Sequence, residues 1–361
     1  MDQIVKHLVK CFKKRTILPY LLELRISHTC NLNCIHCAGV NKKINYKSAL
    51  SLNEWIDIIK QAEKLGIKEC LVIADKEPFT YPNIISLMRE IKKHGIYGKT
   101  TTNGTLLNKQ IFEALIEIGW DCVNISLDGP DPDSNDYIRG KGAFNTVIKN
   151  LKLLRDIKLK KNKTKPKIIF NTVIHKRMFE KIPLMIILAS KLKVSSVDFH
   201  PLSVWFPRIK HLELTKNQVS CFDRIIEETK NLAKEYNIST NIDIFYERKW
   251  EYEQKQDFAN QDKNKEDKMC EKFFSLPCYL PWYFISVQED GRVNPCHTLD
   301  SGKENIRYKK LEQIWKSKYF NDTRQSLLSK KFFQKCLADC CVMQAANHLR
   351  LYNKLRSLTF S

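Results

Sequence analysis

Short apolar runs alternate with longer amphipathic stretches along the first two hundred residues of the chain. The runs are rich in β-branched and aromatic residues, which is typical of buried strands. The stretches between them favour helices. At the start of the stretch at residues 53–65, Ser51 and Glu54 form a capping-box pattern, and Gly66 follows its last apolar position. Strands are therefore expected at residues 21–29, 68–74, 98–103, 121–128, 167–173 and 194–201.

Six strand–helix alternations predict a parallel sheet covered by helices. We expect an α/β fold, a partial (β/α)6 barrel similar to a TIM barrel, followed by a small cysteine-rich α+β domain. Functional loops in such sheets follow the carboxyl ends of the strands, so polar motifs at those ends should gather on one rim.

The second part of the chain changes in character. A long amphipathic helix is expected near residues 215–236, and residues 251–272 are polar and charged, as in a linker. From Cys278 an apolar stretch turns at Asp290 and Gly291, which is a hairpin pattern. A helical stretch near residues 308–329 then precedes a cysteine group and a final amphipathic helix. The expected division is an N-terminal extension at 1–17, a core barrel at 18–245, a linker at 246–277 and the small domain at 278–361.

Charge and cysteine content narrow the function. The chain has 61 Lys and Arg against 40 Asp and Glu, a net charge of +21. Its densest basic run, residues 158–167, has no aromatic residues for base stacking, so nucleic acid is not an expected partner. No stretch approaches the roughly twenty apolar residues of a membrane span, and the start lacks a signal-peptide pattern. We expect a cytoplasmic protein, in which 13 cysteines indicate metal binding.

The first cysteine group is Cys30, Cys34 and Cys37, in C-x3-C-x2-C spacing directly after the first expected strand. Three thiolates on one tight loop can bind three irons of a four-iron four-sulfur (4Fe–4S) cluster and leave the fourth iron open. The alternative is a three-cysteine zinc site completed by His36 or His28.

This loop resembles the signature of the radical S-adenosylmethionine (SAM) superfamily, and His36 matches an aromatic or histidine position common there. The resemblance implies that SAM chelates the open iron of the 4Fe–4S cluster. An electron from the cluster then splits SAM into methionine and a 5′-deoxyadenosyl radical, which abstracts a hydrogen from the substrate.

The resemblance extends along the expected rim. Glu77 and Pro78 stand where the family reads Gly-Gly-Glu-Pro, with Asp75 and Lys76 in place of the two glycines. It implies that Glu77 receives the SAM amino group and that Arg139 faces the SAM carboxylate. The other SAM contacts that it implies, around the ribose and methionine parts, are Thr102, Asn103, Ser126, Asp128 and Asn171.

The second cysteine group begins with Cys278 and Cys296, which the expected hairpin would bring together. A zinc ribbon-like site is one reading of it. The spacing C-x12-G-x4-C resembles the auxiliary-cluster module of the SPASM and twitch subfamilies, which implies a second, auxiliary 4Fe–4S cluster. Its implied ligands are Cys278, Cys296, Cys336 and Cys340, with Cys341 as the alternative to Cys340. The remaining cysteines are expected in packing or at the surface, with Cys270 a spare ligand: Cys11, Cys70, Cys122, Cys221 and Cys270.

The reaction class follows from the second resemblance. An auxiliary cluster in such enzymes takes an electron from the substrate radical or anchors the substrate, which favours oxidation, epimerisation or cross-linking. The substrate is a small molecule such as a sugar or cyclitol, or a peptide bound in the barrel, and flavodoxin or ferredoxin would supply the electron. Asp198 and His200, on one face at the end of the sixth strand, are candidates for a catalytic base, as is His175.

Two other functions compete with a radical SAM oxidoreductase or maturase. One is a zinc-containing nucleic-acid-binding protein, whose affinity would depend steeply on salt. The other is a cluster-bearing scaffold or electron carrier that does not cleave SAM, a reading to which Asp75 and Lys76 lend weight.

Overall fold

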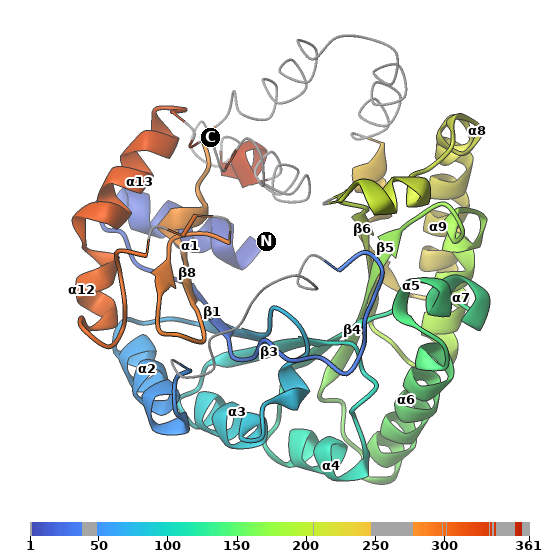
Figure 1. Ribbon diagram of the computed structural model, residues 1–361, viewed down its shortest axis with the longest axis horizontal. Helices are drawn as coiled ribbons and strands as arrows, with labels where there is room; N and C mark the ends of the chain where they lie inside the picture. Colours follow the sequence, from blue (N-terminus) through green and yellow to red (C-terminus); the bar gives the residue numbers. More distant parts are fainter. Residues whose placement is uncertain are drawn as a thin grey trace.

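A nine-stranded sheet organises the protein. Figure 1 shows how the chain is arranged around it. The computed structural model describes residues 2–37, 49–204, 206–246, 277–297, 299–300, 302–331, 333, 336 and 351–355. The strand order is β7-β6-β5-β4-β3-β2-β1-β8-β9. Every neighbouring pair is parallel except β8 and β9. The strands are β1 (Leu21–Arg25), β2 (Glu69–Ile73), β3 (Tyr97–Thr102), β4 (Cys122–Ser126), β5 (Lys167–Ile174), β6 (Ser196–Pro201), β7 (Ser239–Thr240), β8 (Phe284–Val287) and β9 (Val293–Asn294).

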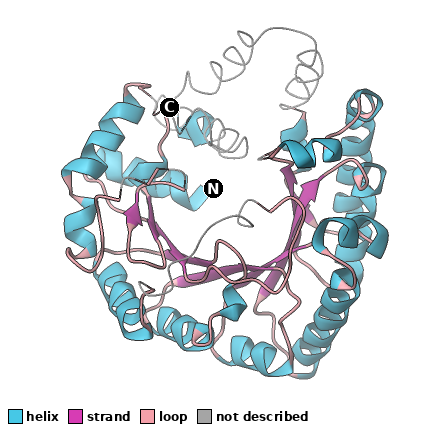
Figure 2. Cartoon of the chain, in the orientation of Figure 1, coloured by secondary structure: helices cyan, strands magenta, loops and turns pink. Residues whose placement is uncertain are grey.

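The sheet curves into an open barrel, with helices along its convex side (Figure 2). The edge strands β7 and β9 do not pair with each other in the described part of the chain. The six strands expected from the sequence are all present, and the α/β partial-barrel prediction is confirmed. The helices are α1 (Asp2–Lys13), α2 (Leu52–Lys64), α3 (Ile84–Lys93), α4 (Lys109–Glu117), α5 (Pro132–Arg139), α6 (Ala143–Lys160), α7 (Ile182–Lys191), α8 (Lys216–Ser220), α9 (Phe222–Glu235), α12 (Leu311–Trp315) and α13 (Lys318–Leu328).

The two faces of the sheet differ in chemistry because successive strand residues point to opposite sides. On β1, Leu22 and Leu24 are fully buried under the helices, together with large side chains such as Trp55. Glu23 and Arg25 alternate with these leucines and therefore point to the opposite, concave side. At β1 the concave side of the sheet is therefore polar, while the apolar core lies between the sheet and its helices.

Two helical segments expected from the sequence are each divided into two helices. Residues 215–236 form α8 and α9, because Cys221, with φ −88° and ψ 0°, ends the first helix. Residues 308–329 form α12 and α13, because the Ser317 side chain accepts a hydrogen bond from the Phe320 amide and begins a new helix. The prediction of one long helix was therefore wrong at residues 215–236, whereas the helical stretch expected near residues 308–329 is present as two helices.

The expected hairpin is present, but it belongs to the main sheet. β8 lies parallel to β1, and β9 returns antiparallel to β8 through a turn in which Gly291 has φ +85°. Ile285 and Val287 of β8 share one apolar core with Leu22 and Leu24. The residues expected to form the linker lie mostly outside the described residues, and only 351–355 of the expected final helix are described. None of the described helices is long and apolar enough to cross a membrane.

The first helix after the cysteine loop confirms its sequence pattern. Ser51 accepts a hydrogen bond from the Glu54 amide at 3.3 Å, and the Glu54 carboxylate accepts one from the Ser51 amide at 2.7 Å. Gly66, just past the end of α2, has φ +79°, a conformation that favours glycine.

Replacement of Ser51 by Ala should lower the free energy of unfolding by about 1 kcal/mol, because the Glu54 amide loses the hydroxyl that accepts its hydrogen bond. Urea unfolding followed by circular dichroism measures the change. Asn83→Ala is the matched control, since Asn83 precedes α3 without a side-chain capping bond. Equal losses in the two variants would contradict the capping role of Ser51.

Candidate functional site

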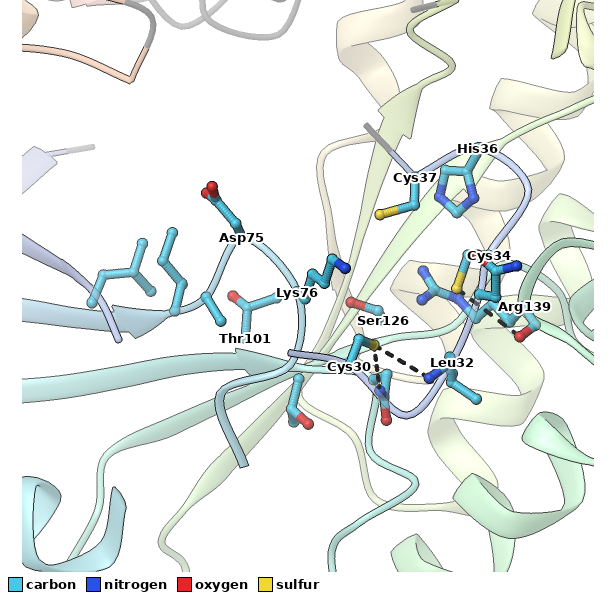
Figure 3. Close-up of a pocket in the computed structure, with 16 residues that line it drawn as sticks. Cys30, Leu32, Cys34, His36, Cys37, Asp75, Lys76, Thr101, Ser126 and Arg139 are labelled. Carbon is cyan, nitrogen blue, oxygen red and sulfur yellow. Dashed lines mark hydrogen bonds between the residues drawn. The ribbon is translucent and has the colours of Figure 1, made fainter. Parts of the chain in front are cut away.

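The three cysteines of the first group line one cavity of about 410 Å³ at the carboxyl ends of the strands (Figure 3). Their loop leaves β1 and is fastened to the end of α5, because the Ile35 amide donates to the Ile138 carbonyl at 3.0 Å. Cys34 and Cys37 are joined by a backbone hydrogen bond of 3.1 Å. The loop thus holds Cys30, Cys34 and Cys37 in one wall of the cavity.

The sulfur environments suit thiolates bound to a cationic group. The Cys30 sulfur accepts hydrogen bonds from the Leu32 amide at 3.3 Å and from the Asn103 side-chain amide at 3.8 Å. Burial raises the pKa of Cys30, and it raises the pKa of Cys34 to about 11 in spite of the nearby Arg139. The thiols therefore need a bound positive charge to ionise, as metal ligands do.

The cavity wall contains four of the residues expected to contact SAM: Thr102, Asn103, Ser126 and Arg139. It also contains Asp75 and Lys76, the two departures from the family motif. Leu71, Ile73 and Thr101 complete it from β2 and β3, and the two-residue alternation of those strands was the signal that could have identified them.

Glu77 is buried and is not among the residues that line the cavity. Its carboxylate accepts hydrogen bonds from the Thr102 hydroxyl at 2.6 Å, the Asn103 amide at 2.7 Å and the Phe79 amide at 3.1 Å. Burial raises the pKa of Glu77, although these three donors oppose the shift. The sequence led us to expect this carboxylate at the SAM amino group; the structure gives it three partners from the protein itself.

Asp128 and Arg139 form a buried ion pair of 2.8 Å. Burial alone would raise the pKa of Asp128, but Arg139 and His36 outweigh it and the pKa is lowered. Burial lowers the pKa of His36 to about 4, so this imidazole is neutral near pH 7. The Arg139 Nε atom is buried without a hydrogen-bond partner in the described structure, and Arg139 lines the cavity. An unpartnered guanidinium donor of this kind fits an anionic ligand group.

The candidates for a catalytic base lie beside this site but do not line the cavity. Asp198 accepts a hydrogen bond from the Ser196 hydroxyl at 2.7 Å, and burial lowers the pKa of His200. The His175 Nε2 atom is 2.9 Å from the Asp128 carbonyl oxygen. Asn171 faces Asp198 in the parallel ladder between β5 and β6 and is also outside the cavity wall.

Cys278, Cys296 and Cys336 are buried in a second apolar cluster, which also contains Val5 and Leu8 of α1. The Cys296 sulfur accepts a hydrogen bond from the Leu299 amide at 3.2 Å, and burial raises the pKa of Cys336 to about 11. Cys340, Cys341 and Cys270 lie outside the described residues. Of the cysteines expected in packing or at the surface, Cys11, Cys70 and Cys122 are buried and Cys221 is exposed.

The described members of the two cysteine groups do not form a site for a single metal ion. Across the described ranges, no three His, Cys, Asp or Glu side chains converge as such a site would require. For the first group this covers every candidate ligand, including His28 and His36. The zinc reading of that loop therefore has no geometric support.

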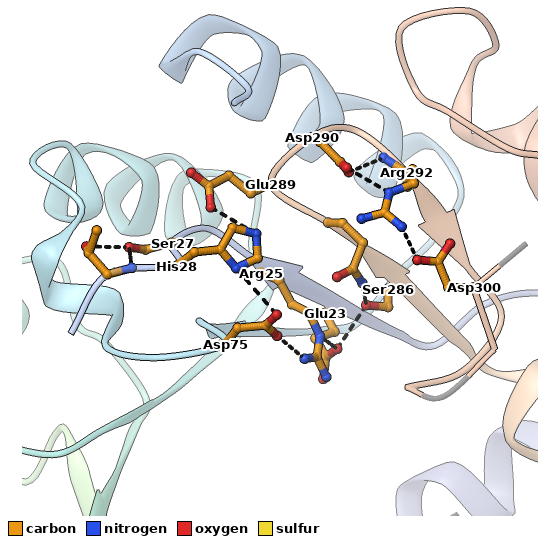
Figure 4. A network of polar contacts seen from close by, with 12 residues as sticks. Glu23, Arg25, Ser27, His28, Asp75, Ser286, Glu289, Asp290, Arg292 and Asp300 are labelled. Atoms are coloured by element: carbon orange, nitrogen blue, oxygen red, sulfur yellow. Dashed lines mark hydrogen bonds and ion pairs between the residues drawn. The ribbon is translucent and has the colours of Figure 1, made fainter. Parts of the chain in front are cut away.

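A chain of polar contacts joins β8 to the cavity wall (Figure 4). Glu23 accepts hydrogen bonds from the Ser286 hydroxyl at 2.9 Å and from Arg25 at 2.7 Å. Arg25 also contacts Asp75 at 2.5 Å. His28 lies between Asp75 and Glu289, at 3.4 and 3.3 Å.

Sequence models of two families match the chain. The radical SAM superfamily model matches residues 24–182, and the SPASM model, an iron–sulfur cluster-binding domain, matches residues 278–341. The chain is 25% identical over 324 residues to a PqqA peptide cyclase of Rhizobium meliloti, across 86% of this chain and 77% of that protein. It is 27% identical over 324 residues to an AdoMet-dependent heme synthase of Methanosarcina barkeri, across 84% and 83%.

Solved structures share the fold. Streptococcus suis SuiB bound to S-adenosylmethionine superposes with a TM-score of 0.66 at 18% identity, across 96% of this chain and 76% of SuiB. SuiB bound to the precursor peptide SuiA gives a TM-score of 0.63, across 96% and 74%. The alternative of a zinc-containing nucleic-acid-binding protein finds no support in these similarities.

The contacts of Glu23 predict that the stability of the fold depends on pH. Burial would raise the pKa of Glu23, but His297 and Arg25 outweigh it and lower the pKa to about 2. Since an unfolded glutamate has a pKa of about 4.3, ionised Glu23 stabilises the fold above that value and loses this effect as the pH falls through 2.

Glu23→Gln should therefore unfold at lower urea concentration than the wild type at pH 7, and the gap should narrow as the pH falls from about 5 to 2. Urea midpoints measured across this range test the change. Glu228→Gln, at an exposed carboxylate on α9, is the control and should leave the midpoint at pH 7 nearly unchanged. A gap that stays constant with pH would contradict the ionised, buried state of Glu23.

Proposed function

Because the chain belongs to the radical SAM superfamily and carries a SPASM iron–sulfur region, we propose that it is an oxidoreductase that modifies a peptide. The observation that supports this most is the cavity at the carboxyl rim, where Cys30, Cys34 and Cys37 face Arg139 and Ser126. This is a place where one ligand can meet the three thiolates and polar groups of several strands at once.

The residues of this cavity fit the cofactors of the superfamily. Cys30, Cys34 and Cys37 would hold the 4Fe–4S cluster, which together with SAM supplies the reducing electron and the hydrogen-abstracting radical. We assign Arg139 to the SAM carboxylate, since its Nε atom lacks a partner in the described structure. Thr102, Asn103 and Ser126 would line the rest of SAM.

Three further residues of the expected set would act through their neighbours. Glu77 holds the Thr102 hydroxyl and the Asn103 amide in place. Asp128 holds the Arg139 guanidinium. Asn171 lies next to Ser126 in the ladder between β4 and β5, and can orient that side of the rim. These are positioning residues in our proposal.

The second cysteine group would hold an auxiliary 4Fe–4S cluster. Cys278, Cys296 and Cys336 are its described ligands, with Cys340 or Cys341 as the fourth. Residues 18–245 and 278–361 would then be the two functional modules, with β8 as the strand that joins the second to the sheet of the first. A flavodoxin or ferredoxin would supply the electrons, and Asp198 or His200 would accept a substrate proton.

A peptide is the substrate favoured by the relatives. One of them is named a peptide cyclase, and SuiB has been solved with a precursor peptide. Nothing in these similarities favours a sugar or cyclitol. The auxiliary cluster would accept an electron from the peptide, so that the net change is an oxidation such as a cross-link.

The cysteine assignments predict separable losses of iron. Wild-type protein reconstituted without oxygen should bind about eight irons and, once reduced, release 5′-deoxyadenosine from SAM. The triple variant C30A/C34A/C37A should lose about half of the iron and all of the SAM cleavage. The double variant C278A/C296A should lose a similar amount of iron and keep SAM cleavage.

Cys221→Ala, at an exposed cysteine away from both groups, should match the wild type in iron content and SAM cleavage. If reduced, iron-loaded wild type leaves SAM intact, the enzyme assignment is wrong and the protein is a scaffold or electron carrier. Iron loss spread equally over all the variants would instead contradict the two separate sites.

Peptides encoded by open reading frames beside this gene are the substrates to test first. We expect one of them to lose two hydrogens, as an oxidative cross-link requires, in a reaction that needs both SAM and reductant. Mass spectrometry measures the loss, and deuterated peptide should transfer deuterium into 5′-deoxyadenosine. Turnover of a cyclitol but of no peptide would overturn the proposed substrate.

A further inference from the structure

The cavity wall contains three charged side chains, and two of them have ionic partners within the protein. Arg139 pairs with Asp128 at 2.8 Å, and Asp75 contacts Arg25 at 2.5 Å. For the third, Lys76, the structure describes no hydrogen bond or ion pair, although the side chain is half-buried and lines the cavity.

The backbone around Lys76 is fixed on both sides. The Asp75 amide donates to the Ser27 carbonyl at 3.2 Å, and the Glu77 amide donates to the Thr29 carbonyl at 2.9 Å. Both carbonyls belong to the segment that leads from β1 into the cysteine loop. The backbone of this lysine is therefore in place before a ligand binds, and only its side chain has to be ordered.

Lys76 and Arg139 enter the cavity from different elements. Lys76 follows β2, whereas Arg139 ends α5, and Figure 3 shows them approaching from opposite sides. A bound SAM molecule has one carboxylate, which the proposed function assigns to Arg139. The second cation is therefore available to a second anionic group.

We propose that Lys76 binds a carboxylate in this cavity and thereby selects a substrate with an acidic side chain beside the reacting residue. This inference rests on the proposed function, because it takes the cavity as the place where SAM and peptide meet. A carboxylate could also come from SAM itself. The shared chemistry is an ammonium–carboxylate hydrogen bond, and two sets of binding measurements separate the sources.

The first set uses minimal peptide probes on iron-loaded protein saturated with SAM. N-acetylglutamate N-methylamide carries the acidic side chain, and the glutamine counterpart is its neutral match. Wild type should bind the glutamate probe about tenfold more tightly, as expected for one hydrogen bond between charged groups. Lys76→Met should bind both probes equally, and Lys76→Arg should restore part of the preference. Calorimetry or ligand-observed NMR measures the affinities.

The second set compares SAM with decarboxylated SAM in wild type and Lys76→Met. If the carboxylate comes from the substrate, both proteins should prefer SAM by the same factor. A preference about tenfold smaller in the variant would assign the Lys76 carboxylate to SAM instead. Lys64→Met, at an exposed position on α2, is the control and should behave as wild type in both sets.

The outcomes distinguish this inference from the proposed function. Iron content and circular dichroism of each variant show that it is folded and loaded. If wild type binds SAM but Lys76→Met matches it in both sets, the carboxylate role of Lys76 is overturned and the proposed function stands. If wild type fails to bind SAM, the proposed function fails, and the probe titration without SAM still decides whether Lys76 prefers an acid.

Discussion

The buried carboxylate of Glu77 fixes the geometry on which the cavity depends. The carboxylate accepts hydrogen bonds from Thr102 and Asn103 and so joins the segment after β2 to the end of β3. The backbone amide of Glu77 donates to the Thr29 carbonyl, directly before the cysteine loop. Hydrogen bonds to a carboxylate are stronger than neutral ones, and loss of the carboxylate would leave buried donors unpaired. One side chain thus sets the relative positions of the cysteine loop and the two strands that face it.

A second buried anion does the same for the other half of the protein. Glu23 lies on β1 and joins Ser286 of β8 to Arg25, which in turn contacts Asp75 in the cavity wall. Buried ion pairs add little net stability, but one that is misaligned leaves a charge without a partner. The network therefore favours a single register of β8 against β1, and so places the second cysteine group at a defined distance along the sheet from the first.

Local patterns were sufficient to predict the strands and the capping box of α2, because these depend on alternation and chain order. The family resemblance named Thr102, Asn103, Ser126 and Arg139, and all four line one cavity at the rim. The position of β8 beside β1 could not be predicted, because it depends on contacts between residues more than two hundred positions apart, such as that of Ser286 with Glu23. The contacts of Glu77 within the protein could not be predicted for a related reason: they join it to residues of another strand, and only the fold brings Thr102 and Asn103 to its carboxylate.

The two departures from the family motif now have different explanations. In place of the two glycines this chain has Asp75 and Lys76, whose opposite charges could pair with each other. They do not, because the Asp75 carboxylate instead contacts Arg25 and His28. Lys76 is left facing the cavity with its charge uncompensated by any described side chain. A positive charge that the protein leaves in this way, opposite a paired arginine, is best explained by a negative charge on the ligand.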